Sequence, residues 1–139
     1  MGKIILNAKN LTKSYQNGDR RLVVLNRINL KREGGTITTI IGESGSGKST
    51  LLNVLSSLDT FDSGKLLIEN EDIKSFNEKK ISSFRNEKIG FIFQFHHLLP
   101  DFTVMDNVLM PLWIKKGFGH YERPLDLLNN FGLHKIKDK

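Results

Sequence analysis

The chain has 139 residues, of which 38% are hydrophobic and 26% charged, the proportions of one modest globular domain rather than of a disordered segment. It contains no cysteine, which excludes disulfide bonds and thiolate metal sites. The formal net charge of +6 would favour anionic partners, but the basic residues are scattered and their densest cluster, at 77–80, is short. We therefore assign most of this charge to solvated surface.

The first half of the chain is predicted to be rich in strands. A strand with edge character is expected at 3–15 and a second strand at 21–33, with a turn around the Asn17-Gly18 pair between them. The compact β-branched run TITTII at 36–41 predicts a buried strand. Two strands thus precede the one that leads into the glycine-rich loop, which suggests an added β-layer.

Helices and strands are then expected in alternation. Leu51, Leu55 and Leu58 fall on one face of a predicted helix at 48–58. Three further elements follow in the pattern: a strand at 65–70, a short helix at 78–87 and a buried strand at 88–94.

Two more helices are predicted in the last third of the chain. Thr103 begins a capping box with Asp106 in the return position, and Pro111 should kink that helix or limit its length. A final helix at 121–131 is expected to end at Gly132. No segment is long enough for a membrane span, because even the apolar run that ends at Gln94 is far short of ~20 residues.

The stretch GESGSGKS matches the phosphate-binding pattern G-x-x-x-x-G-K-[ST] with Gly42, Gly47, Lys48 and Ser49. Glycines let the backbone turn its N–H groups toward a phosphate, and the following helix adds its positive end. Lys48 supplies a charge for the β- and γ-phosphates, and Ser49 offers a hydroxyl to Mg²⁺. A dinucleotide site is disfavoured because Thr50 stands at the third glycine position, and the kinase motifs HRD and DFG are absent.

On both sides of this loop, the sequence resembles the ATP-binding subunits of ABC transporters. Tyr15 in KSYQNG stands where that family places an aromatic residue on adenine, and IGFIFQ resembles the strand leading to the family's Q-loop glutamine, here Gln94. The stretch FQFHHLLP is similar to the lipoprotein-releasing system ATPases, although related exporters and the cell-division ATPase share LLP or similar sequences.

The resemblance implies an α/β fold: a P-loop NTPase core with an added antiparallel β-layer and the start of a helical subdomain. We expect residues 1–94 to hold the β-layer and core, and 95–139 to begin the subdomain. The implied ligands are ATP and Mg²⁺, with catalytic roles for Lys48 and Gln94 and metal contacts from Ser49 and Gln94. The expected nucleotide-binding residues are Tyr15, Gly42, Ser44, Gly45, Ser46, Gly47, Lys48, Ser49 and Thr50.

The implied partners are membrane permease subunits, which would dock near 94–113, and a second copy of the complete protein. The implied location is cytoplasmic, on the inner face of a bacterial inner membrane. A nucleic-acid partner is not expected, because no basic stripe occurs. His96 and His97 are adjacent, so we do not expect them to share a metal. We interpret Phe91, Phe93, Phe95 and Phe102 as core and docking surface.

Several parts of the family mechanism are missing from the sequence. It shows no LSGGQ-type signature, no apolar run leading to an Asp-Glu pair, and no switch histidine, since His120 and His134 have the wrong setting. We therefore expect this chain to be the N-terminal portion of an ATPase subunit. Such a portion would bind nucleotide at best, because it lacks the carboxylate that activates water.

Overall fold

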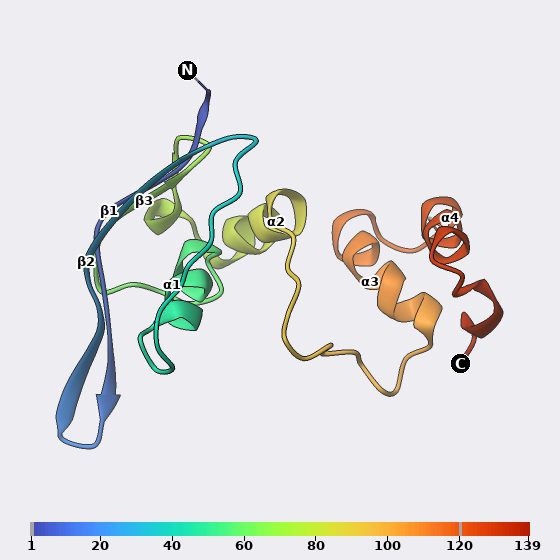
Figure 1. The fold of residues 1–139 in the computed structure, drawn as a ribbon. Coiled ribbons are helices and arrows are strands. Elements are labelled where there is room, and N and C mark those ends of the chain that lie inside the picture. Colours follow the sequence, from blue (N-terminus) through green and yellow to red (C-terminus); the bar gives the residue numbers. More distant parts are fainter. Residues whose placement is uncertain (1, 120) are drawn as a thin grey trace. The chain divides into compact units, whose positions relative to one another are not determined.

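The computed structural model describes residues 2–119 and 121–139. They form two compact units, Met1–Arg85 and Asn86–Lys139 (Figure 1). The expected functional division after residue 94 stays a prediction.

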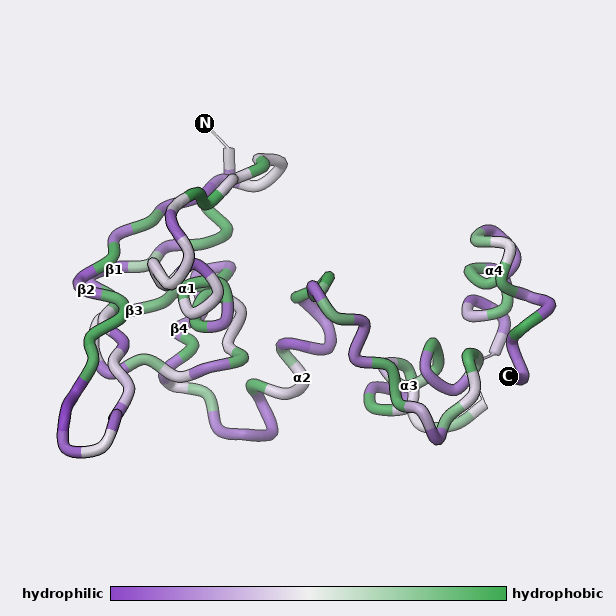
Figure 2. The backbone as a smooth tube through the Cα atoms, turned by 60° about the horizontal axis from the view of Figure 1, so that its bottom comes forward, coloured by the Kyte–Doolittle hydropathy of each residue, from purple (hydrophilic) through white to green (hydrophobic). Residues whose placement is uncertain are grey.

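The first unit is built on a four-stranded antiparallel sheet in the order β2-β1-β3-β4. Strands β1 (Ile4–Asn17) and β2 (Arg20–Glu33) form the long hairpin that was predicted, and its turn is hydrophilic (Figures 1 and 2). The predicted edge character of the first strand is wrong, because β3 (Ser63–Ile68) pairs with its other side. The short β4 (Glu71–Asp72) completes the sheet.

One helix and the sheet share the core of the first unit. Helix α1 (Lys48–Leu55) buries Val54, and Leu11 of β1 and Leu66 of β3 are likewise fully buried. Burying a side chain of this size contributes about 1.5–3 kcal/mol relative to leaving it in water. The helix is shorter than the predicted 48–58, since Ser56 already has the backbone of a C-cap.

The polypeptide leaves β4 through a 3-10 turn, η1 (Ile73–Ser75), and helix α2 (Glu78–Lys88). Asn77 caps α2, because its side chain accepts a hydrogen bond of 2.8 Å from the Lys80 amide. The buried Phe84 of this helix lies edge-on to Phe76, with ring centroids 5.4 Å apart. α2 is otherwise largely hydrophilic (Figure 2) and follows the prediction for 78–87.

The second unit contains two helices and a terminal turn. Helix α3 (Val104–Lys116) begins at the predicted capping box and continues through Pro111 to Lys116, so the proline does not end it. Helix α4 (Glu122–Asn130) is followed by Gly132 at φ 70°, as predicted, and by the turn η2 (His134–Ile136). Leu109 and Leu128 form the buried centre of this unit. None of the helices within the described residues is long and apolar enough to cross a membrane.

The two predicted buried strands at 36–41 and 88–94 are wrong. Both runs are irregular apart from the end of α2, and Ile37, Ile41 and Ile92 are 98%, 88% and 103% exposed. β-branched residues stabilise a strand only when a neighbouring strand completes the hydrogen-bond ladder and a packed face covers the side chains. Within 2–119 and 121–139, neither run pairs with a strand.

Candidate phosphate-binding site

A glycine-rich loop at 42–47 leads from the exposed run at 36–41 into helix α1. Gly45 and Gly47 have φ values of 79° and 88°, which side chains disfavour. A Cβ atom on Gly47 would also lie 2.9 Å from Cγ1 of Val24 in β2. The glycine therefore allows the loop to run close against the sheet before the helix begins.

Helix α1 begins without a side-chain cap. Its N-cap residue is Gly47, and the first intrahelical bond runs from the Leu51 amide to the Gly47 carbonyl at 2.8 Å. The N–H groups of the first turn have no carbonyl partner within the helix, and they carry its partial positive charge. Ser49 and Thr50 lie in this turn. An anion in front of the loop would be a suitable partner for these groups.

The ammonium group of Lys48 is folded back over the loop. It donates hydrogen bonds to the carbonyls of Gly42 at 2.9 Å and Glu43 at 2.6 Å, and to Oγ of Ser46 at 3.5 Å. A phosphate oxygen would be a stronger, charged acceptor than these carbonyls. The loop thus holds a positive charge beside N–H groups that have no carbonyl partner within the helix, a combination suited to phosphate. Ser44 is exposed in the loop.

Tyr15 lies near the end of β1 and is 39% exposed. Its hydroxyl donates a hydrogen bond of 2.7 Å to Oδ2 of Asp59, and the Lys13 ammonium lies 4.8 Å from its ring centroid. Burial acts to raise the pKa of Asp59, but hydrogen bonds from Lys13, Tyr15 and the Thr60 amide outweigh it and lower the pKa below its usual value. The anionic form of Asp59 is therefore the one that fits this environment.

Lys13 and Asp59 were not expected as part of the site. They are 46 residues apart, so no local pattern links them. One signal in the sequence does exist, because alternate residues of a strand face the same side. Lys13 shares that side with Leu11 and is itself buried, and a lysine at a buried position requires an acidic partner.

Gln94 lies in the second unit, exposed in the irregular stretch after α2. Its proposed contact with Mg²⁺ beside Ser49 stays a prediction. His96 accepts a hydrogen bond of 3.4 Å from the Leu98 amide, whereas the His97 ring lies edge-on to Phe93. In the part of the chain that is described, three or more metal-ligating side chains do not gather at any point.

The aromatic residues around Gln94 do not form a core. The exposed fractions are 36% for Phe91, 46% for Phe93, 70% for Phe95 and 43% for Phe102, which corrects the part of the prediction that placed them inside. Phe91 and Phe93 stack on each other with centroids 5.4 Å apart. The docking part of the prediction is untested.

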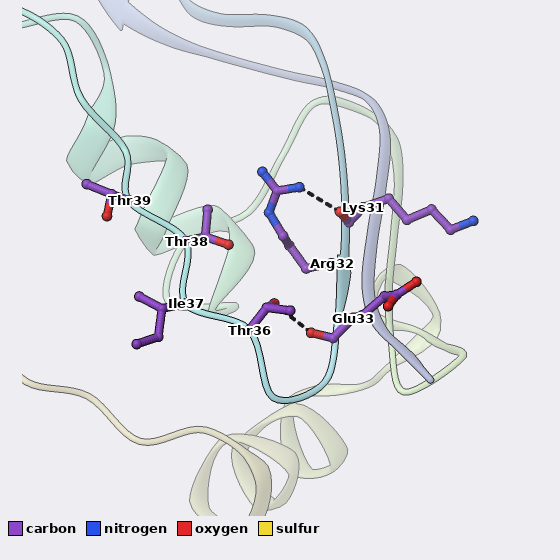
Figure 3. Close-up of a pocket in the computed structure, with 7 residues that line it drawn as sticks. All are labelled: Lys31, Arg32, Glu33, Thr36, Ile37, Thr38 and Thr39. Carbon is purple, nitrogen blue, oxygen red and sulfur yellow. Dashed lines mark hydrogen bonds between the residues drawn. The ribbon is translucent and has the colours of Figure 1, made fainter. Parts of the chain in front are cut away.

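A separate pocket of about 540 Å³ opens where the chain turns from β2 into the run at 36–41 (Figure 3). Thr36 closes the turn by donating to the Glu33 carbonyl at 2.8 Å, and Arg32 donates to the Lys31 carbonyl at 2.8 Å. Ile37 of the lining is almost fully exposed. None of the predicted site residues lines this pocket, so we do not connect it with phosphate binding.

Comparison with known proteins identifies the family. The profile of the ABC transporter family matches residues 25–139. The chain is 47% identical over 129 residues to the lipoprotein-releasing system ATP-binding protein LolD of Desulfotalea psychrophila, covering 91% of this chain and 58% of that protein. It is 46% identical over 140 residues to LolD of Pseudomonas syringae pv. tomato, covering 99% and 62%. The chain thus spans about three fifths of these relatives.

Solved structures agree with the sequence comparison. A dimeric bacterial ABC transporter cassette superposes with a TM-score of 0.86 at 31% identity, covering 96% of this chain and 60% of that one. A dimeric ATP-binding cassette in a post-hydrolysis state, bound to ADP and Pi, gives a TM-score of 0.85 with the same identity and coverage. These likenesses confirm the predicted P-loop NTPase fold with its antiparallel β-layer. The chain belongs to the ABC transporter family and represents part of an ATP-binding cassette similar to the LolD type.

Proposed function

We propose that this chain is the nucleotide-binding portion of an ABC transporter ATPase that powers lipoprotein release. The observation that carries the proposal is the Lys48 ammonium held over a glycine-rich loop at the uncapped start of α1. Similarity to relatives named for lipoprotein release supports the choice of transported substrate.

The loop would bind the phosphates of ATP through three kinds of group. Backbone N–H groups at Gly45, Gly47 and the start of α1 would donate to phosphate oxygens, and Lys48 would exchange its carbonyl partners for them. Tyr15 would stack on the adenine base. Ser49 and Gln94 would hold Mg²⁺, which neutralises phosphate charge during hydrolysis.

We further propose that residues 94–113 dock against a membrane permease subunit at the inner face of a bacterial inner membrane. Support comes from an apolar pocket of about 530 Å³ in the second unit. Its lining includes Leu98, Leu99 and Phe102, which are 59%, 43% and 43% exposed. Exposed apolar surface of this kind is typical of interaction sites. In the complete protein we expect two copies to act together, as in the dimeric cassettes that this fold resembles.

The same features fit the ATPase of a related drug or peptide exporter, or of a cell-division system, because the LLP stretch is shared. Co-purification discriminates between these readings. A lipoprotein-releasing permease recovered with the full-length protein supports our choice, and recovery of a different permease overturns it.

For the 139 residues alone, we propose nucleotide binding without turnover, because the sequence contains neither an LSGGQ-type signature nor an apolar run ending in Asp-Glu. Isothermal titration with Mg-ATP should show binding that Lys48→Ala removes and that the control Lys80→Ala retains. A malachite-green assay should detect no phosphate release above the Lys48→Ala background. Binding that survives in Lys48→Ala would contradict the proposed site.

A further inference from the structure

The carboxylate of Asp59 links the buried Lys13 to Tyr15, the residue that we propose stacks on the adenine base. Asp59 accepts from the Lys13 ammonium at 2.7 Å through Oδ1 and from the Tyr15 hydroxyl at 2.7 Å through Oδ2. The Thr60 amide also donates to Oδ1 at 2.7 Å. Three donors therefore fix the orientation of the carboxylate, and through it the position of the phenol.

Lys13 also limits which side of the Tyr15 ring is available. Only 7% of this lysine is exposed, and its ammonium lies 4.8 Å from the ring centroid. A cation at this position covers one ring face and interacts favourably with its electrons. Tyr15 as a whole is 39% exposed, and we infer that a planar ligand would take the ring face opposite the ammonium.

The same carboxylate is tied to the phosphate loop through α1. The Asp59 and Leu58 amides donate to the Asn53 carbonyl in the last turn of that helix, at 3.1 and 2.9 Å. The helix begins at Lys48 and rises about 12 Å over its eight residues. One rigid element thus connects the group that holds phosphate with the group that holds Tyr15.

We propose that Lys13 and Asp59 are positioning residues for nucleotide binding, which fix Tyr15 so that a purine base stacks on one defined face at a set distance from the phosphate loop. This inference rests on the proposed function. Beyond the proposed function, it assigns selectivity for the base to two charged residues outside the phosphate loop, Lys13 and Asp59. A purely structural role for the pair would instead weaken every ligand equally.

The test compares two ligands of the 139-residue chain, Mg-ATP and Mg-tripolyphosphate, by isothermal titration. Tripolyphosphate reaches the loop but has no base, so the ratio of the two dissociation constants isolates the contribution of Tyr15. Base stacking of this kind contributes about 1–3 kcal/mol, which is roughly 5- to 150-fold in affinity. The wild-type chain should therefore prefer ATP, and Tyr15→Leu should remove that preference.

The decisive variants leave the tyrosine ring in place. Lys13→Met and Asp59→Asn should reduce the preference for ATP by ~3- to 10-fold and leave tripolyphosphate binding unchanged. Tyr15→Phe, which only loses the hydroxyl bond to Asp59, should reduce it less, and Lys13→Arg should retain it. Lys80→Met is the matched control, because Lys80 also pairs with a carboxylate, Glu71 at 2.8 Å, and lies 3.8 Å from the Phe76 ring centroid.

Each outcome bears on a separate claim. An unchanged preference in Lys13→Met and Asp59→Asn overturns the inference, as does an equal loss for both ligands. If either variant unfolds, as circular dichroism would show, Tyr15→Phe decides: an unchanged preference overturns the inference. Absence of ATP binding in the wild-type chain, or binding unaffected by Lys48→Ala, overturns the proposed function instead.

Discussion

Helices α1 and α3 begin in opposite ways. At α3, the Thr103 hydroxyl accepts from the Asp106 amide at 3.1 Å, while the Asp106 carboxylate accepts from the Thr103 amide at 3.1 Å. The amides of Val104 and Met105 donate to the carbonyls of Lys139 and Lys137 at 3.0 and 2.9 Å. At α1, a glycine replaces the capping side chain.

This difference shows which helix start is structural and which is available to a ligand. The N–H groups of α3 are occupied by the protein's own oxygens, so an anion gains nothing there. Those of α1 stand beside a lysine whose present partners are two backbone carbonyls and the Ser46 hydroxyl, all of them uncharged. Variants at the two starts should therefore separate binding from stability.

The largest effect is expected from Lys48→Ala at the start of α1. Loss of a charged hydrogen-bond donor to phosphate weakens binding by about 1.5–3 kcal/mol for each such bond, or roughly 10- to 150-fold. The free energy of unfolding should change little, because the three present contacts of this ammonium are exposed to solvent. Titration with Mg-ATP and urea unfolding measure the two quantities, and a stability loss equal to the binding loss would contradict the distinction.

Gly47→Ala should affect both binding and stability. A side chain at φ 88° is strained by about 1–3 kcal/mol, and its Cβ would approach the Val24 side chain. We expect urea unfolding to show a loss of about 1–3 kcal/mol together with weaker ATP binding. Gly117→Ala is a matched control, since it also has positive φ, at 77°, but no atom within 4 Å of the new Cβ. If Gly47→Ala and Gly117→Ala weaken ATP binding equally, the proposed role of the loop in phosphate binding is contradicted.

Thr103→Ala should affect α3 alone. Loss of an N-cap side chain costs about 1 kcal/mol, within a range of 0.5–2 kcal/mol. Hydrogen exchange should become faster in the first turn of α3, and Mg-ATP binding should stay as in the wild type. Thr103→Ser keeps the hydroxyl and should keep the protection. Weaker nucleotide binding in Thr103→Ala would show that the two helix starts are not independent in function.

The smallest expected effect is on acid stability near Tyr15. Burial raises the pKa of Asp59, but hydrogen bonds from Lys13 and Tyr15 lower it more, so the folded-state pKa lies below the usual ~3.9. Asp59 thus stabilises the fold above about pH 4, and this contribution is lost as the pH falls through the lower folded-state pKa. In thermal unfolding between pH 2 and 7, the melting temperature should fall less steeply with decreasing pH in Asp59→Asn than in the wild-type chain. If the melting temperature falls equally steeply in both proteins, the lowered pKa assigned to Asp59 is contradicted.

Local patterns in the sequence predicted the elements that depend on local interactions. The Thr103 capping box, the Gly132 stop and the glycine loop at 42–47 each depend on residues within a few positions, and the structure has all three. The likeness to known cassettes confirmed the fold class.

The failures involve long-range partners. TITTII has the composition of a buried strand, but only a neighbouring strand can make it one. The predicted edge position of β1 was wrong for the converse reason, because β3 pairs with it although the partners, from Thr12–Ser63 to Leu6–Ile68, are far apart in sequence. The Lys13–Asp59 pair was missed because its members are also far apart, at 46 residues. The assigned roles of Tyr15 and Gln94 stay predictions.

The uncovered runs at 36–41 and 91–95 have a consequence for the chain during its synthesis. Both are short and irregular and contain apolar residues in water, with Ile37 and Ile92 almost fully exposed. Segments of this kind associate with one another or with chaperones while a nascent protein is incomplete. A cell that makes this protein would therefore have to keep these residues from associating with other exposed apolar segments for as long as nothing covers them.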